Sequence, residues 1–296
     1  MSKGVKSIFI ATLLFAGMNV FVKLLSNLPV YELTLFRSIF TTLICFIIIK
    51  RKRISWLGSR RPVLFLRGTL GAISLILFFK SVQALPLATA TLVHYITPFF
   101  TTFFGFLFLG ERLNKIQWVF LVICFTGIAL TQSSNSNLLE LNASNVGLLA
   151  GLCGCVAAAG AYNCIRYIGA SEDPNVVLIH FSIITIPISL VLLCIYGGFQ
   201  WPTCLEWGYI VCMGILTQAA QYYMTLAYQN EEVGTIAIFT NMGIIYAIIN
   251  GIIFFDEIPS KIACLGIGIV ITGLLFNVFY DKGRNFFGSR FNKTLS

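Results

Sequence analysis

The chain has 296 residues, of which 57% are hydrophobic and only 10% are charged, and its mean hydropathy is +0.87. Too few polar side chains are present to cover a water-soluble globule of this size, so the composition excludes a soluble domain and predicts an integral membrane protein. The net charge of +9 is explained by basic residues in cytoplasmic loops beside anionic headgroups, and it requires no nucleic-acid partner.

Apolar runs long enough to cross a bilayer recur along the whole chain. A spanning helix needs about 20 apolar residues, because the hydrocarbon core is roughly 30 Å thick and a helix rises 1.5 Å per residue. In chain order, the predicted spans are Val5–Leu25, Val30–Ile49, Val63–Val82, Leu87–Leu109, Ile116–Gln132, Asn145–Tyr167, Asn175–Tyr196, Glu206–Tyr228, Gly234–Phe255 and Ile262–Tyr280. The sequence therefore predicts an all-α integral membrane protein with ten transmembrane helices.

An internal duplication relates the two halves of the chain. Residues 84–130 and 230–276 align without a gap at a constant offset of 146 residues. Polar and small residues match as well as apolar ones, including Gly105 with Gly251, Glu111 with Glu257, and Thr126-Gly127 with Thr272-Gly273. Because each half contributes an odd number of spans, the second half enters the membrane from the opposite side, which predicts two inverted five-helix repeats.

The repeats predict how the chain is organised. The first repeat is expected at residues 1–133, an extracytoplasmic linker at 134–144, the second repeat at 145–281 and a basic cytoplasmic tail at 282–296. With the N-terminus in the cytoplasm, 15 of the 20 Lys and Arg residues lie on that side, as the positive-inside rule requires. We therefore expect both termini in the cytoplasm and a multi-pass protein of the cytoplasmic (inner) membrane of a bacterial cell.

The nine cysteines do not form a recognisable disulfide or metal pattern. All except Cys204 fall within predicted spans, and the closest pair, Cys153 and Cys155, points to different helix faces. We interpret them as small apolar side chains that fill space, and we predict no metal and no cofactor. Two isolated histidines without a buried carboxylate provide little material for catalysis, so no catalytic residue is predicted and the chain is not expected to be an enzyme.

Polar side chains within the spans are the candidates for a functional site, because each is costly in a bilayer. On the fourth span, Thr91, His94 and Tyr95 share one face while bulky apolar residues cover the other. Small polar residues also serve helix packing, and that alternative stays open. Packing requires neither an imidazole nor a phenol, however, so we interpret this face as the wall of a hydrated cavity. Pro98 predicts a kink that frees the carbonyl of His94.

Other spans carry polar residues of the same kind. On the eighth span, Gln218, Gln221 and Tyr222 recur at helical spacing on one face. Together with polar residues of the first, second, fourth, sixth and ninth spans, these positions define a predicted substrate-binding set. Its members are Asn19, Arg37, His94, Tyr95, Asn163, Gln218, Gln221, Tyr222 and Asn241.

Arg37 carries the strongest electrostatic argument of this set. It lies seven residues from the outer end of its span, and no Asp or Glu lies deep within any predicted span to neutralise it. Helix carbonyls could hold its guanidinium as a structural clamp, or it could attract a carboxylate or phosphate on a ligand. Arg67 lies four residues from a cytoplasmic helix end, and we expect its side chain to snorkel to the membrane surface.

Several motifs resemble the EamA-type repeat of the drug/metabolite transporter superfamily. They are Leu66-Arg67-Gly68, Ala84-Leu85-Pro86, Thr89-Ala90-Thr91, Leu109-Gly110-Glu111-Arg112-Leu113 and Thr126-Gly127, with a second copy from Glu257 to Thr272-Gly273. The resemblance spans nearly the whole chain. It implies a ten-helix carrier in which the first four helices of each half surround a central cavity and the fifth lies at the periphery. It does not select a substrate.

We therefore predict a secondary-type transporter that moves a small polar organic solute, with an acidic group, by alternating access. A channel-like or scramblase-like membrane protein and an intramembrane enzyme are the alternatives. The lipid bilayer and a small-molecule solute are the expected partners. Pairing of two chains as a homodimer, the direction of transport and the coupling mode all stay open at this point.

Overall fold

The structure is a computed structural model that describes residues 2–94, 96–109, 143–231 and 242–257, together with a few isolated residues outside these ranges. Contacts divide the chain into two units. The first comprises Met1–Glu111 and Leu139–Ile258, and the second comprises Arg112–Leu138 and Pro259–Ser296. The second unit lies largely outside the described residues, and the fold below is that of the first unit.

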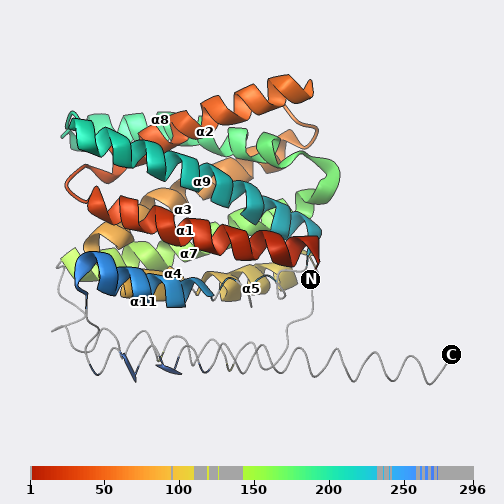
Figure 1. The fold of residues 1–296 in the computed structure, drawn as a ribbon. Helices are drawn as coiled ribbons and strands as arrows, with labels where there is room; N and C mark the ends of the chain where they lie inside the picture. The colour runs from red at the N-terminus through yellow and green to blue at the C-terminus, as the bar shows by residue number, and fades with distance from the viewer. Residues whose placement is uncertain are drawn as a thin grey trace, which may run out of the picture. The chain divides into compact units, whose positions relative to one another are not determined.

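The described part of the first unit is built from helices joined by short turns, without a strand (Figure 1). The helices are α1 (Lys3–Leu24), α2 (Val30–Lys52), α3 (Arg61–Ala84), α4 (Leu87–His94), α5 (Thr97–Leu109), α7 (Ala143–Ile168), the 3-10 turn η1 (Gly169–Ser171), α8 (Pro174–Tyr196), α9 (Cys204–Asn230) and α11 (Met242–Phe255). The predicted all-α fold is confirmed. The predicted spans Ile116–Gln132 and Ile262–Tyr280 lie largely outside the described residues, so the count of ten helices is not established.

The helices pack in pairs that follow the duplication. Helix α1 packs along α9, α3 packs along α7, and α2 packs along α8. Figure 1 shows α1 beside α9 and α2 beside α8. Exchanging the two halves of the chain converts the α1–α9 pair into the α7–α3 pair and leaves the α2–α8 pair unchanged. This pattern is the one expected when two repeats are related by an internal two-fold axis.

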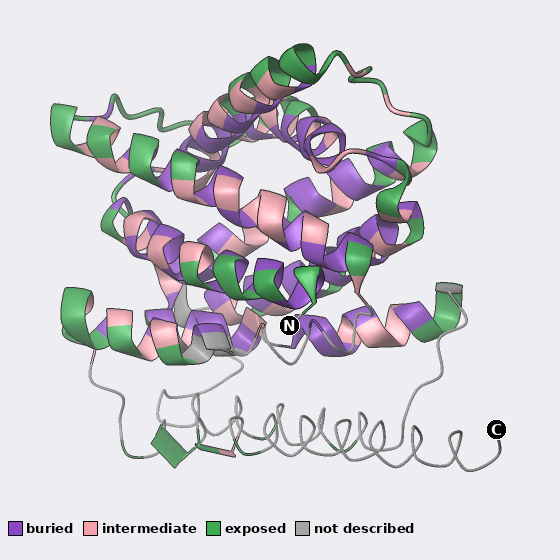
Figure 2. Ribbon diagram, turned by 45° about the vertical axis from the view of Figure 1, so that its right-hand side comes forward, coloured by how far each residue is buried: buried purple, intermediate pink, exposed green. Residues whose placement is uncertain are grey.

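Figure 2 shows which residues of the described helices are buried and which are exposed, and their types are those of a membrane protein. Large apolar side chains lie on the outside, where Phe65, Val191 and Ile253 are 62%, 56% and 66% exposed, whereas Thr34 and Thr185 are fully buried. Exposed apolar faces of this extent require lipid rather than water as their solvent. Five described helices are long and apolar enough to span a bilayer, namely Lys3–Leu24, Val30–Lys52, Arg61–Ala84, Asn145–Ser171 and Pro174–Tyr196.

The predicted span Leu87–Leu109 is interrupted rather than continuous. Helix α4 ends at His94 and α5 begins at Thr97. Pro98 is the second residue of α5, where its missing N–H would have no partner within the helix and therefore breaks no helical bond. The expectation of one kinked helix was wrong, because the proline starts a new helix.

Gly68 determines how closely α3 approaches α8. A Cβ atom added at this position would collide with the side chain of Ile184 and lie 3.0 Å from the backbone oxygen of His180. We expect Gly68→Ala to lower the free energy of unfolding by about 1–3 kcal/mol, because the two helices must separate. Thermal unfolding in detergent would measure it. Gly208→Ala is the control, since nothing lies within 4 Å of a Cβ added there. Equal stability of the two variants would contradict the close approach.

Candidate functional site

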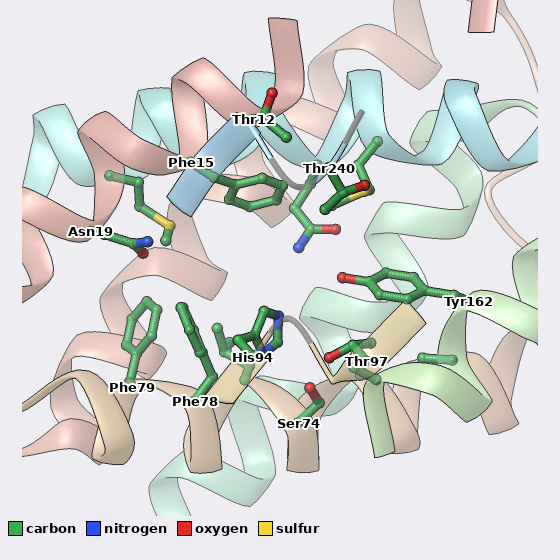
Figure 3. A pocket seen from close by; sticks show the side chains of 18 of the residues that line it. Thr12, Phe15, Asn19, Ser74, Phe78, Phe79, His94, Thr97, Tyr162 and Thr240 are labelled. Carbon is green, nitrogen blue, oxygen red and sulfur yellow. The ribbon is translucent and has the colours of Figure 1, made fainter. Parts of the chain in front are cut away.

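A cavity of about 120 Å³ lies within the first unit (Figure 3). A single buried water needs only about 10–15 Å³ on the same measure, so the cavity has room for a small solute with water. Its polar lining residues are Thr12, Asn19, Arg37, Arg67, Ser74, Thr91, His94, Thr97, Tyr162, Gln221, Tyr228 and Thr240. Its phenylalanines are Phe15, Phe78, Phe79 and Phe181. The lining comes from both halves of the chain.

The structure brings together part of the predicted substrate-binding set. Four of its nine members line the cavity, and they are Asn19, Arg37, His94 and Gln221. Two others, Tyr95 and Asn241, lie outside the described residues. The remaining three form other contacts, two of which are hydrogen bonds between helices.

Asn163, Gln218 and Tyr222 are not among the described lining residues. The Nδ2 atom of Asn163 donates to the backbone oxygen of Thr101 at 2.9 Å, which joins α7 to α5. The Nε2 atom of Gln218 donates to Cys45 Sγ at 3.1 Å, which joins α9 to α2. Tyr222 packs against a neighbouring tyrosine ring. Helical spacing shows which residues share a face, but it does not show which neighbour that face meets.

Arg67 lines the cavity, and the expectation that it snorkels to the membrane surface was wrong. Its side chain is only 2% exposed, and its guanidinium carbon lies 4.9 Å from the centre of the Phe181 ring on α8. Gly71, one turn further along α3, makes room for it, because a Cβ there would collide with Nη1 of Arg67. Position along a helix does not show the direction in which the side chain of Arg67 turns.

Arg37 approaches the same ring from α2. Its side chain is 1% exposed, and its guanidinium carbon lies 5.2 Å from the centre of the Phe181 ring. Because both guanidinium carbons lie within 5.2 Å of the same ring centre, they are at most about 10 Å apart. The Nε and Nη1 atoms of Arg37 and the Nε atom of Arg67 are buried without a hydrogen-bond partner. No Asp or Glu occurs among the described residues that line the cavity.

This pair of buried cations is unfavourable by itself. Two unit charges at most about 10 Å apart repel by at least about 2 kcal/mol at an effective dielectric constant of 20, and removing each charge from water costs several kcal/mol. A cation–π contact with Phe181 offsets only about 0.5–2 kcal/mol per arginine. The Phe181 ring therefore does not compensate for the burial of the two charges. An anion bound in the cavity would compensate for the burial of both charges.

His94 lies on a mixed polar and aromatic wall beside the helix interruption. Its ring centre is 4.4 Å from that of Phe78. Its Nδ1 atom is buried without a hydrogen-bond partner, and Figure 3 shows Ser74 and Thr97 on the same side of the cavity. An imidazole with a free ring nitrogen can donate to or accept from a polar solute, depending on its tautomer.

Tyr162 is a lining residue that the sequence analysis did not identify. Its ring stacks on Tyr228 with centres 4.7 Å apart, and Figure 3 shows its hydroxyl pointing into the cavity. The sequence analysis selected the adjacent Asn163, which points about 100° away from Tyr162 on the helix and donates to the backbone oxygen of Thr101 on α5 instead. The available signal was the pattern of Ala158, Ala161 and Tyr162, which share one face and all line the cavity.

Matching contacts join helix ends on the two sides of the cavity. Beyond one end, Lys23 Nζ donates to the backbone oxygen of Leu85 at 2.8 Å. Beyond the other, Arg166 Nη1 donates to the backbone oxygen of Glu231 at 3.2 Å. Leu85 and Glu231 are the C-cap residues of α3 and α9, and the offset of 146 residues relates them. The same type of contact thus occurs once in each half.

Lys23 also forms an ion pair with Glu257. The other carboxylate oxygen of Glu257 accepts from the backbone N–H of Leu87 at 2.7 Å, at the start of α4. Lys23 and Glu257 therefore connect the ends of α1, α3 and α11 with the start of α4.

We expect Glu257→Gln to lower the free energy of unfolding by about 1–2 kcal/mol, because the amide can still accept from Leu87 but no longer pairs with a charge. The loss should shrink when Lys23 is already methionine. A double-mutant cycle of thermal unfolding would measure the coupling. Identical losses in both backgrounds would show that the ion pair contributes nothing. Lys52→Met, which removes the more exposed ion pair with Asp173, is the matched control.

In the part of the chain that the structure describes, the cysteines are free thiols, and no group of three or more His, Cys, Asp or Glu side chains could hold a metal ion. The candidate site is therefore defined by the arginines, the imidazole, the amides and the hydroxyls of the cavity.

A bundle with exposed apolar faces and an internal cavity, in which a few polar side chains lie among apolar and aromatic ones, is compatible with the architecture of a membrane transporter. The EamA-like transporter family matches residues 2–132 and 145–279, so the chain belongs to this family. The predicted membership of the drug/metabolite transporter superfamily is confirmed, and so is the two-repeat fold.

Proteins with transporter names are similar to this chain over most of its length. It is 28% identical over 274 residues to the pseudopaline exporter CntI of Pseudomonas aeruginosa, covering 92% of this chain and 94% of that protein. It is 28% identical to solute carrier family 35 member G1 of Mus musculus, covering 85% and 71%. A solved crystal structure matches with a TM-score of 0.71 and 18% identity, covering 93% of this chain and 96% of the other, which shows the fold alone.

Proposed function

We propose that this chain is a secondary-type transporter that moves a small polar organic solute with an acidic group by alternating access. Arg37 carries the proposal. It is almost completely buried, two of its nitrogens have no hydrogen-bond partner, and it lines a cavity without an acid among the described lining residues. A guanidinium in such a place is suited to bind a carboxylate or phosphate through paired hydrogen bonds.

Alternating access would use the two matching contacts in turn. In this proposal the two repeats rock about the cavity, so that the Lys23–Leu85 contact opens on one side and the Arg166–Glu231 contact opens on the other. Each contact is a hydrogen bond from one charged side chain near a helix end, and Lys23 forms its ion pair with Glu257 as well. Such contacts are weak enough to break during a transport cycle, because partly exposed charge interactions are typically worth about 1 kcal/mol or less.

The proposed membrane orientation places both termini in the cytoplasm. The first repeat would then occupy residues 1–133, the extracytoplasmic linker 134–144, and the inverted second repeat 145–281, in the cytoplasmic membrane. Lys23 would lie on the outer side and Arg166 on the inner side. Impermeant reagents applied outside the cell should not label cysteines introduced at 50–62, and efficient labelling there would contradict this orientation.

Counterflow in proteoliposomes would test the transport function. We expect saturable uptake of a labelled organic acid that is stimulated by the same unlabelled acid inside the vesicles. A channel-like or scramblase-like protein would show no such stimulation, and an enzyme would release the solute in a changed form. Either outcome would contradict the proposal. Because the solute is unidentified, a panel of metabolites should first be screened by thermal stabilisation of the purified protein.

A further inference from the structure

We propose that the cavity binds two negative charges of its cargo, one at Arg37 and one at Arg67, so that the cargo is a dianionic organic solute. This inference rests on the proposed transport function and specifies its substrate class. The site would recognise two negatively charged oxygen atoms of the cargo, one within reach of each guanidinium. A dicarboxylate and a phosphate monoester both carry two such atoms.

The two arginines form one site, although they come from different helices. Arg37 on α2 and Arg67 on α3 both lie over the ring of Phe181 on α8, at 5.2 and 4.9 Å. A ring against the flat face of a guanidinium leaves its N–H groups available at the edge. Those edges are where carboxylate or phosphate oxygens bind, often through two parallel hydrogen bonds.

The charge of the lining favours a dianion over a monoanion. Two arginines line the cavity, and no Asp or Glu is among the lining residues that the structure describes. A cargo with one negative charge would leave one of two nearly completely buried cations without a counter-charge. A cargo with two negative charges compensates both. The hydroxyl of Tyr162 and the amide of Gln221 also line the cavity and can donate to the remaining oxygens.

A purely structural role for Arg67 fits the geometry less well. A guanidinium that clamps helices would donate to their carbonyl oxygens, but Nε of Arg67 is buried without a partner. If the side chain of Arg67 turned outward to the membrane surface, it would not need the space that Gly71 leaves on the inner face of α3. Gly71 leaves space where a Cβ would collide with Nη1 of Arg67 and lie 2.8 Å from the Phe181 ring. The local sequence of α3 therefore accommodates an inward-facing arginine.

The aromatic residues of the lining fit the carbon skeleton of such a cargo. Phe15, Phe78 and Phe79 contribute to the same cavity as the two arginines. Apolar walls with a few placed polar groups are typical of small-molecule sites. The cargo would then place its acidic groups at the arginines and its carbon atoms against the phenylalanines.

Matched acids and their monoamides provide the test. Glutarate and its monoamide differ by one charge and almost nothing else, and succinate or adipate with their monoamides extend the series. Glycerol 3-phosphate with its methyl ester, a phosphate diester that carries one charge fewer, tests the phosphate monoester. Purified full-length protein would be used, with thermal stabilisation for binding and inhibition of counterflow for transport. We expect one of the dianions to bind at least 30-fold more tightly than its less charged partner.

Substitution of Arg67 assigns the second charge. We expect Arg67→Gln to weaken binding of the dianion at least tenfold and to change binding of the monoamide by less than threefold. The preference for the dianion over the monoamide should therefore fall at least threefold. Lys80→Gln is the matched control, because Lys80 lies on the same helix, is exposed and does not line the cavity. The preference of the unaltered protein is a second readout that does not depend on whether the variant folds.

The outcomes separate this inference from the proposed function. Equal binding of dianion and monoamide to the unaltered protein, or equal weakening of both by Arg67→Gln, would overturn the two-charge site while saturable counterflow of an acid still supported transport. Counterflow of neutral solutes alone would overturn both this inference and the acidic cargo. Complete absence of counterflow would reject transport itself. Preference for a dicarboxylate or for a phosphate monoester would support the inference and identify which acid is recognised.

Discussion

Arg37→Gln is expected to reduce transport of the acidic cargo at least about 30-fold, because removing one partner of a buried charge pair costs about 2–5 kcal/mol. Arg37→Lys keeps the charge but loses the planar fork, so it should restore only part of the activity. Initial rates of counterflow in proteoliposomes would measure both changes. Normal transport by Arg37→Gln, with transport lost in His94→Ala or Gln221→Ala, would contradict an acidic cargo bound at Arg37.

The same substitution should make the protein without cargo more stable. Arg37 is a buried cation near a second cation, so its replacement by a neutral side chain removes both the burial cost and the repulsion. If Arg37 were a structural clamp, Arg37→Gln would instead lower the unfolding temperature. Thermal unfolding in detergent therefore separates the two roles. A gain in stability together with a loss of transport is the signature of a binding residue.

Phe181→Ala is expected to cause the largest loss of stability, about 3–5 kcal/mol, because it deletes a buried aromatic ring. Phe181 is 2% exposed and packs with both arginines and with Gly71. Phe181→Leu retains much of the volume but not the π face, and should lose less. Thermal unfolding would measure the difference, while the affinity for the acid panel would show whether the ring orients the arginines. Equal losses for the two variants would contradict this expectation, because they would mean that the volume kept by leucine contributes little and that the aromatic ring itself accounts for the stability.

Most of the described fold could be predicted from the sequence, because the bilayer imposes a simple rule on helix length and composition. Helices α1, α2 and α8 lie within a few residues of their predicted spans. The exception among the described spans is the interruption between His94 and Thr97. Proline indicated a disturbance there, but a proline can kink one helix or begin another. Which occurs depends on packing that a single segment does not reveal.

The candidate site was less accessible to prediction than the fold. Asn19 and Arg37 were selected by polarity within a span, and both line the cavity. Asn163 has the same polarity but uses its amide to reach the backbone of α5. Arg67 was assigned to the surface because it lies near a helix end, and Tyr162 was overlooked beside a more polar neighbour. These differences arise from helix rotation in the bundle, which neighbouring helices determine.

The matching contacts of Lys23 and Arg166 have a consequence for how the two halves can diverge. Both cations donate to main-chain oxygens, at Leu85 and at Glu231. Every amino acid supplies that acceptor, so mutation at either acceptor position leaves the hydrogen bond possible. A leucine and a glutamate can therefore hold equivalent places, and a comparison of side chains alone would miss that they do. Evolutionary constraint should fall on the donors, whose length and charge have no main-chain substitute.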